Sequence, residues 1–289
     1  MQAHYRLLEQ EPTFRAAQFA LEGDTVRAMR AEFRGRRTGI VRIPVVVHVV
    51  YKDKRQNVTM AQIRSQIAVL NRDFRAKNAD RKRTPVPWKG LVADAQIQFQ
   101  LATRDPRGKA TNGVTRTPTT RASFGTGDTV KSAATGGADP WPADRYLNIW
   151  VCNLAGGLLG YAQFPGGPAR TDGVVIHYVA FGTRGTATAP FDRGRTTTHE
   201  VGHWLNLRHI WGDTEDCSGT DAVADTPNAG MPNYGRPKFP KISCHNGPNG
   251  DMFMNYMDYV DDVAMYMFTA QQVARMRTTL DGPRRTIGT

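Results

Sequence analysis

The chain has 289 residues, of which 40% are hydrophobic and 22% charged, and a formal net charge of +12. This length and composition can build one large or two small domains with a sizeable core, and no run approaches the roughly 18 consecutive apolar residues of a membrane span. Insertion into a membrane is therefore not expected. The basic clusters lack interleaved aromatic residues and any nucleic-acid-binding motif, so no nucleic-acid partner is expected either.

Residues 1–38 form a separate segment. Apolar residues recur in it at helical spacing, and it ends in the basic stretch Arg34-Gly35-Arg36-Arg37, directly before an apolar run. Such a stretch is a candidate processing site. The alternative is an ordinary N-terminal helical layer with an exposed linker. Residues 1–6 lack the apolar region of a signal peptide.

Residues 39–209 have the pattern of an α/β half. The run 43–51 is apolar at successive positions, which is typical of a central strand. Thr59 and Gln62 form a capping box for a helix that reaches to about Lys77. Further strands are predicted at 95–101, 146–152 and 173–179. Together these elements predict a mixed, twisted sheet backed by a helix.

A glycine-containing apolar segment, residues 156–164, lies between two of these predicted strands. An edge strand at this place, with Leu158 and Gly160 at a cleft, could bind an extended peptide by adding a strand to the sheet. A plain edge strand without a binding role fits the pattern equally well.

The most informative stretch is HEVGHWLNLRH, residues 199–209. At about 100° per residue, positions i and i+4 of a helix lie on one face, one turn apart. His199 and His203 can therefore direct their imidazoles at one zinc ion. Glu200 lies beside that ion, where it can take a proton from a water activated by the metal.

His209 is the candidate for a third ligand. In a continuous helix it would lie about 240° around the axis from His203, so the helix must stop first. Asn206 is a residue type that can adopt the left-handed conformation of such a stop. Two other interpretations stay open. Thr197 and Glu200 also fit a capping box, and Glu215 is an alternative third ligand.

Beyond His209, residues 211–251 are rich in Gly, Pro, Asn and Asp and show no periodicity. The acids in this part are Asp213, Glu215, Asp216, Asp221 and Asp225. Oxygen-rich loops of this kind often hold calcium. The alternative is solvated turn chemistry, because no EF-hand spacing is present.

The chain has three cysteines, an odd number, so at least one thiol is left unpaired. Cys217 and Cys244 both lie in the loop-rich region, where a covalent link would help to hold the loops in place. Cys152 ends an apolar run and is predicted to be a small buried side chain.

These stretches together resemble the pappalysin family of metzincin zinc proteases, in particular its bacterial ulilysin-like branch. The matching stretches are HEVGHWLNLRHIWGD (199–213), DTP (225–227), GDMFMNYMDY (250–259), IPVVVHVVY (43–51) and GYAQFPGGPARTDGVVI (160–176). A methionine in a tight turn, here Met257, is the second mark of metzincins.

The resemblance implies an α/β metzincin fold with a propeptide at 1–38. It implies an upper subdomain at about 39–209 and an irregular lower subdomain at about 210–289, which ends in a helix at 269–280. It also implies a secreted, monomeric zinc endopeptidase that acts on proteins or peptides. In relatives a propeptide cysteine caps the zinc ahead of the segment matching residues 1–8, so latency by that thiolate is not expected here.

The resemblance also assigns roles to residues by position. The zinc ligands are His199, His203 and His209, the general base is Glu200, and Tyr259 stabilises the tetrahedral intermediate. The calcium candidates are Asp221, Asp225 and Thr226, and the remaining disulfide is Cys217–Cys244. The second disulfide of relatives is absent, because Arg236 and Ala264 stand at its two positions.

In the family, the segment after Met257 lines the pocket for the residue that follows the scissile bond. Asp261 and Asp262 come early in it, but the later half, with Met265, is apolar. We therefore expect an apolar or mixed preference, whereas an Asp262 that reaches the pocket would favour Arg or Lys. Two other classes stay open: a zinc hydrolase of small amides, and a non-catalytic peptide-binding relative, against which the intact Glu200 argues.

Overall fold

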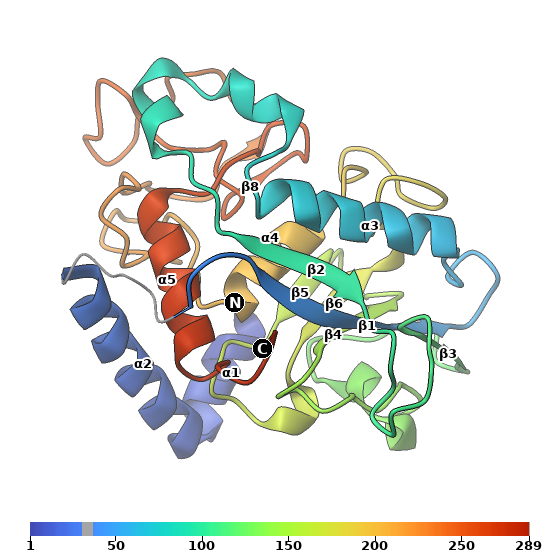
Figure 1. The fold of residues 1–289 in the computed structure, drawn as a ribbon. Helices are drawn as coiled ribbons and strands as arrows, with labels where there is room; N and C mark the ends of the chain where they lie inside the picture. Colours follow the sequence, from blue (N-terminus) through green and yellow to red (C-terminus); the bar gives the residue numbers. More distant parts are fainter. Residues whose placement is uncertain (31–36, 289) are drawn as a thin grey trace.

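A mixed six-stranded sheet forms the centre of the molecule in the computed structural model, which describes residues 1–30 and 37–288 (Figure 1). The strand order is β2-β1-β4-β6-β5, and β3 also pairs with β1. The strands are β1 (Val41–Tyr51), β2 (Ile97–Leu101), β3 (Val114–Pro118), β4 (Leu147–Cys152), β5 (Gly160–Ala162) and β6 (Val174–His177). All pairs are parallel except β5 with β6. The predicted segment at 156–164 therefore supplies an antiparallel edge strand.

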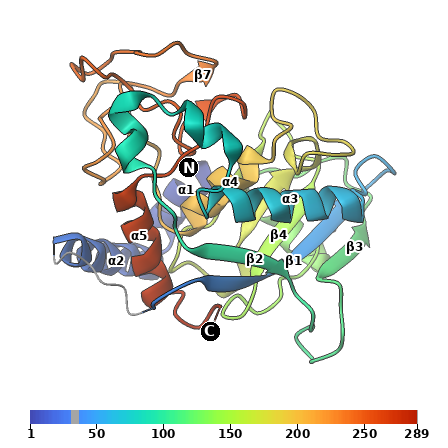
Figure 2. The same ribbon diagram turned by 45° about the horizontal axis from the view of Figure 1, so that its top comes forward.

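Strand β1 is the central strand that its apolar run predicted, and the two faces of the sheet are covered differently. Helices α3 (Met60–Asp73) and α4 (Arg195–Trp204) cover one face, where Val45 and Val47 belong to the same buried cluster as Ile63 and Val201. Figure 2 shows α3 lying across the strands on that face. The opposite face packs against loops, short 3₁₀ turns and Ala3 near the N-terminus of the chain. This arrangement places α4 next to the edge strand β5.

Helix α3 begins after Thr59 as predicted, but it ends at Asp73 and not near Lys77. The chain leaves the helix because Ala76 adopts a left-handed conformation with φ 46°, and the Lys77 N–H donates to the Arg72 carbonyl (2.7 Å). This six-to-one hydrogen bond is the Schellman closure of a helix end, which satisfies a carbonyl that would otherwise lack a partner. The apolar periodicity does not reveal such a stop.

The chain after α4 is mostly irregular, as its composition predicted. It contains one short two-stranded ladder, β7 (Tyr234–Gly235) with β8 (Tyr259–Val260), and the closing helix α5 (Ala270–Asp281). Thr269 caps α5 in a capping box with Gln272. The 3₁₀ turns in the described residues are η1 (Ala79–Arg83), η2 (Val86–Leu91), η3 (Thr129–Lys131), η4 (Ala133–Thr135), η5 (Ala169–Thr171) and η6 (Tyr178–Ala180).

The disulfide Cys217–Cys244 closes a loop in this irregular part, with a sequence separation of 27 residues. Cys152 is the free cysteine; it is fully buried, and burial raises the pKa of its thiol. Both findings confirm the predictions for the cysteines. Because this part has little regular structure, the covalent link takes the place of a larger core.

The N-terminal segment is helical, as predicted, with α1 (Gln2–Gln10) and α2 (Pro12–Arg30). Helix α2 lies beside α5 in both views (Figures 1 and 2). Its Glu22 pairs with Arg275 of α5 and with Arg208, just after α4. The first three residues of the predicted basic processing stretch, 34–36, lie outside the described residues. In the described part of the chain, no helix is long and apolar enough to cross a membrane.

Candidate active site

Helix α4 carries the HExxH stretch and begins three residues earlier than the capping-box interpretation requires. Its N-cap is Gly194 in the left-handed conformation, and Arg195 is its first residue. Thr197 and Glu200 therefore lie inside the helix, and no capping box forms between them. The earlier start is stabilised by tertiary contacts, because Arg195 pairs with Asp73 (3.1 Å) at the end of α3 and with Asp80 (3.2 Å) in η1.

Helix α4 ends at Trp204, before His209, as a third histidine ligand requires. Asn206 adopts φ 73°, which is the left-handed conformation predicted for the stop. The Leu207 N–H donates to the Gly202 carbonyl (2.9 Å), and the Asn206 N–H donates to the His203 carbonyl (2.9 Å). This is the Schellman pattern. It reverses the chain, so that His209 returns to the face of α4 that carries His199 and His203.

The three histidines converge through one nitrogen each. His209 Nε2 lies 3.2 Å from His199 Nε2 and 3.1 Å from His203 Nε2. The opposite ring nitrogens are all engaged: Nδ1 of His199 donates to the Tyr256 carbonyl (2.7 Å), and Nδ1 of His203 donates to the Leu207 carbonyl (2.8 Å). Nδ1 of His209 contacts an Asp213 carboxylate oxygen (2.6 Å). Each ring is therefore held with its Nε2 lone pair facing the other two.

This donor set fits zinc. Three neutral imidazoles that donate from Nδ1 to a carbonyl or a carboxylate are the usual protein ligands of zinc, with the outer partners fixing the tautomer. Burial lowers the pKa of His199 to about 4 and lowers those of His203 and His209 well below the usual value, so the rings stay neutral. Three lone pairs at this separation repel one another unless a cation lies between them.

Asp213 is a site residue that the sequence analysis placed only among the loop acids. Its carboxylate holds His209 through one oxygen and accepts a hydrogen bond from the Tyr5 hydroxyl (3.2 Å) of α1 through the other. The signal available in the sequence was its position, four residues after His209 in HIWGD. That position alone does not show where the carboxylate points, because the loop around it has no periodicity from which a direction could be inferred.

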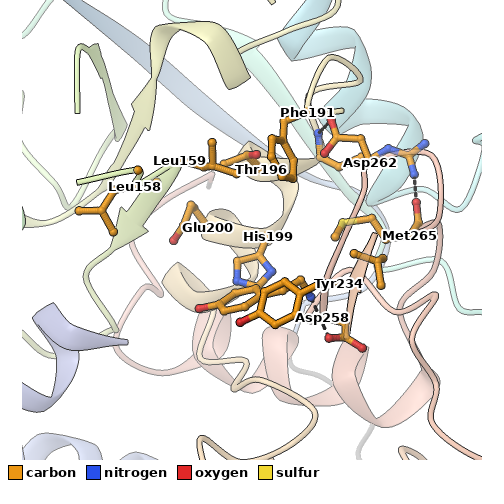
Figure 3. A pocket seen from close by; sticks show the side chains of 15 residues that line it. Leu158, Leu159, Phe191, Thr196, His199, Glu200, Tyr234, Asp258, Asp262 and Met265 are labelled. Carbon is orange, nitrogen blue, oxygen red and sulfur yellow. Dashed lines mark hydrogen bonds between the residues drawn. The ribbon is translucent and has the colours of Figure 1, made fainter. Parts of the chain in front are cut away.

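Glu200 is buried beside the histidines and faces the edge strand. A Cβ atom on Gly160 would lie 2.9 Å from Glu200 Oε1, so the absence of a side chain at 160 is what lets β5 pass this close. Burial raises the pKa of Glu200 to about 8. A dication bound by the histidines would favour the charged form. Figure 3 shows Glu200 next to His199, on the side of Leu158 and Leu159.

Met257 lies beneath the helix, as predicted for the methionine turn. It is fully buried, and its sulfur approaches Gly202 so closely that a Cβ atom there would lie 2.5 Å from it. Tyr259 lies two residues further on, 39% exposed, with its ring 4.7 Å from that of His209 and 5.6 Å from that of His199. The structure thus brings Tyr259 to the rim of the histidine cluster.

A cavity of about 380 Å³ opens beside Glu200 and His199. Its lining includes Leu158, Gly160 and Met265, the three predicted substrate-contacting residues, together with apolar Phe191 and Val260. Figure 3 shows Met265 on the side of the cavity away from Leu158.

The acids near this cavity already have partners. One oxygen of Asp262 accepts from the backbone N–H groups of Arg193 (2.8 Å) and Arg195 (3.1 Å), and Asp261 pairs with Arg236 (3.0 Å). Asp258 accepts from the backbone and the side chain of Asn233. Burial raises the pKa of Asp258 to about 7 and that of Asp262 to about 6. Asp262 thus reaches the cavity but also ties the start of α4 to the chain after Met257.

The calcium candidates are only partly brought together. Asp221 is buried and accepts from the Thr226 hydroxyl (2.7 Å), and burial raises its pKa to about 7. The carboxylate of Asp225 instead accepts from Thr269 (2.7 Å) and from the backbone N–H of Gln271 (2.9 Å) at the start of α5. Within residues 1–30 and 37–288, the three histidines are the one group of three His, Cys, Asp or Glu side chains whose ligand atoms lie close enough to share an ion.

Comparison with known proteins identifies a family and several relatives that match this chain. The family described as pregnancy-associated plasma protein-A (Peptidase_M43) matches residues 132–281. An extracellular metalloprotease of Arthroderma otae is 35% identical over 201 residues, which cover 65% of this chain and 71% of the relative. An extracellular metalloprotease of Arthroderma benhamiae is 30% identical over 246 residues, which cover 83% of this chain and 77% of the relative.

Two solved structures are similar over most of their length. Mature mirolysin of Tannerella forsythia, in complex with a cleaved peptide, is 55% identical and superimposes with a TM-score of 0.85 over 87% of this chain and 97% of its own. A promirolysin mutant from the same organism is 50% identical, with a TM-score of 0.90 over 98% of this chain and 94% of its own. The proenzyme therefore matches more of this chain than the mature enzyme does.

Proposed function

The chain belongs to the pregnancy-associated plasma protein-A family, the pappalysins, and is a metzincin metalloendopeptidase; we propose that it is a secreted enzyme in which Glu200 activates water at a zinc ion held by His199, His203 and His209. The observation that carries this proposal is the convergence of three Nε2 atoms, each fixed by a partner on its Nδ1, directly beside a buried carboxylate. The extracellular relatives support secretion.

Zinc, when bound, would polarise both the attacking water and the scissile carbonyl. The protein supplies the remaining steps. Glu200 accepts the proton of the attacking water and passes it to the leaving amine, since its carboxylate faces the position between the histidines and β5. The free edge of β5 pairs with the substrate backbone and aligns the peptide beside Glu200. Tyr259, at the rim of the histidine cluster, donates a hydrogen bond from its hydroxyl to the developing oxyanion.

The experiment that tests this proposal is cleavage-site profiling of a protein mixture, with and without a zinc chelator and with zinc added back. We expect endoproteolytic cleavage that the chelator abolishes and zinc restores. Cleavage that a chelator does not affect would contradict the zinc mechanism. Turnover confined to small amides, with no protein cleaved, would restore the alternative of a small-amide hydrolase.

We assign residues 1–38 as a propeptide, with an upper subdomain at about 39–209 and a lower one at about 210–289. Two observations support the propeptide. The proenzyme relative covers 98% of this chain whereas the mature relative covers 87%. In addition, α1 reaches the catalytic centre, where Tyr5 contacts Asp213 and the His4 ring stacks at 4.0 Å on Phe164, which itself lies 5.2 Å from His203.

A structural calcium ion is the second cofactor that we propose, with Asp221 and Thr226 as donors; Asp225, the third candidate, would have to leave Thr269 to join them. A buried carboxylate whose pKa is raised gains most from a bound cation, and a cation that binds only the folded state raises its stability. We expect the melting temperature to fall by several degrees in a calcium-selective chelator while zinc is retained, and to recover with added calcium. Differential scanning calorimetry with metal analysis checks this, and an unchanged melting temperature argues against the ion.

At the cavity beside Met265 we expect an apolar or mixed preference for the residue after the scissile bond. Each CH₂ group buried there contributes about 0.8 kcal/mol, and the nearby acids already accept hydrogen bonds or pair with Arg236. Sequencing the products of a peptide library measures the preference. If nearly every new N-terminus is Arg or Lys, the prediction is wrong. The variant Asp262→Asn then tests whether the other carboxylate oxygen of Asp262 binds the basic side chain of the substrate.

A further inference from the structure

Helix α1 begins at the catalytic centre and runs away from it along the face of the edge strand. The Tyr5 hydroxyl of α1 donates to Asp213 (3.2 Å), which holds His209, and the His4 ring centre lies 4.0 Å from that of Phe164, whose ring lies 5.2 Å from that of His203, so α1 starts close to the histidines. Ala3 is buried in a cluster with Tyr161 of β5, against which Leu158 also packs. In the described part of the chain, no residue of α1 lines the Met265 cavity. Helix α1 thus covers the half of the cleft opposite that cavity.

Arg6 is the cation that α1 brings to this half of the cleft. Its Nη1 donates to the Thr126 carbonyl (2.7 Å), and its Nη2 donates to Asp128 Oδ2 (3.1 Å). The two acceptors are thus spaced to receive the two terminal nitrogens of one guanidinium. The side chain of Asp128 is only 14% exposed and that of Arg6 30%. A carboxylate and a carbonyl side by side in such a sheltered place favour a planar cation that can donate to both.

The acceptor site is built from residues outside the N-terminal segment. Lys131, nearly fully buried, holds the other oxygen of Asp128 (2.8 Å) and donates to the Thr171 carbonyl (2.7 Å). Its ammonium lies 5.0 Å from the ring centre of Tyr161. Because Lys131 occupies one carboxylate oxygen, the second oxygen and the Thr126 carbonyl stay directed at the position of the Arg6 guanidinium.

We propose that Asp128 and the Thr126 carbonyl form a subsite for a basic side chain of the substrate, upstream of the scissile bond, and that Arg6 fills it while residues 1–38 are in place. The proposal rests on the proposed function and on release of that segment. Arg6 directly follows Tyr5, whose hydroxyl contacts the Asp213 that holds His209. The basic residue is therefore expected among the few positions before the cleaved bond.

The test uses the full chain from which the N-terminal segment has been released by a site-specific protease, whose recognition sequence is inserted between residues 34 and 37. A peptide library is cleaved, and the residues upstream of each cut are counted. We expect Arg, more than Lys, to be enriched at one of the few positions before the cut, because the two acceptors match the two terminal nitrogens of a guanidinium. Cleavage without that enrichment overturns the subsite, whereas failure to cleave any peptide contradicts the proposed function and not the subsite alone.

A matched pair of peptides then tests whether the preference for a basic side chain depends on Asp128. One carries Arg at the enriched position and the other carries Met. For Asp128→Asn we expect kcat/KM on the Arg peptide to fall about tenfold or more relative to the Met peptide, because a charge-assisted hydrogen bond is lost. Asp144→Asn, an exposed acid in the loop before β4, should leave the ratio unchanged. An unchanged ratio in a folded Asp128→Asn overturns the proposal; if that variant does not fold, the wild-type profile decides.

Discussion

Glu200→Gln is expected to lower kcat/KM on peptide substrates by about 10²- to 10⁴-fold, the range that a general base contributes. The variant keeps the size of the side chain that Gly160 accommodates, so β5 and α4 should stay in place. Because Glu200 is not among the converging ligands, zinc should remain bound with the same stoichiometry. Steady-state kinetics, metal analysis and thermal melting together measure the three expectations. Glu200→Ala should also retain zinc and fold while losing nearly all turnover.

Glu215→Gln is the matched control, since it removes the same charge from an exposed position in the loop after His209. We expect it to retain both activity and zinc. Loss of zinc in this variant would revive the interpretation in which Glu215 replaces His209 as the third ligand. Activity above about a tenth of wild type in Glu200→Gln would show that another group abstracts the proton, because general-base catalysis contributes at least about 10²-fold.

Arg195→Met is expected to destabilise the folded protein by about 3–5 kcal/mol, the cost of leaving buried charges without their partner. Arg195 is 6% exposed and pairs with Asp73 and Asp80, donates to the Met265 carbonyl and lies 5.1 Å from the Tyr256 ring centre. Burial already raises the pKa of Asp73 to about 6, and without Arg195 the charged form of Asp73 would be less favourable still. The free energy of unfolding, measured in urea, gives the effect.

Arg236→Met serves as the control for an exposed pair. Its side chain is 68% exposed and pairs with Asp261. Ion pairs of this kind contribute about 0–1 kcal/mol, so the unfolding free energy should change by no more than that. If the free energy of unfolding falls by the same small amount in both variants, the cluster around Arg195 is not holding α3, η1 and α4 together. A large loss confined to Arg195→Met supports that role.

Much of the zinc site could be predicted from local rules. Helical periodicity placed His199 and His203 on one face, and the need to reverse the chain identified Asn206, which has the predicted left-handed conformation. The same kind of local signal predicted the central strand β1 and the start of α3 after Thr59. The roles of Met257 and Tyr259 and the pairing of Cys217 with Cys244 came from the family resemblance. The structure confirms the disulfide, and it places Met257 against Gly202 and the Tyr259 ring 4.7 Å from that of His209.

Other features were decided by contacts between residues far apart in the chain. Helix α4 starts at Arg195 because Asp73 and Asp80, more than a hundred residues earlier, pair with it. The carboxylate of Asp225 accepts a hydrogen bond from Thr269 at the start of α5, so it is not directed at Asp221. Neither choice has a signal in the neighbouring residues.

The sequence by itself determined the chemistry of this protein: the ligand types, their spacing along a helix, and the stop that returns the third histidine. These depend on backbone geometry over a few residues, which the order of amino acids sets directly. Only the tertiary structure decided what surrounds that chemistry, including Asp213 on His209 and Arg6 on Asp128. Such pairs depend on where whole elements pack, because a buried charge adopts whichever partner the fold brings near it.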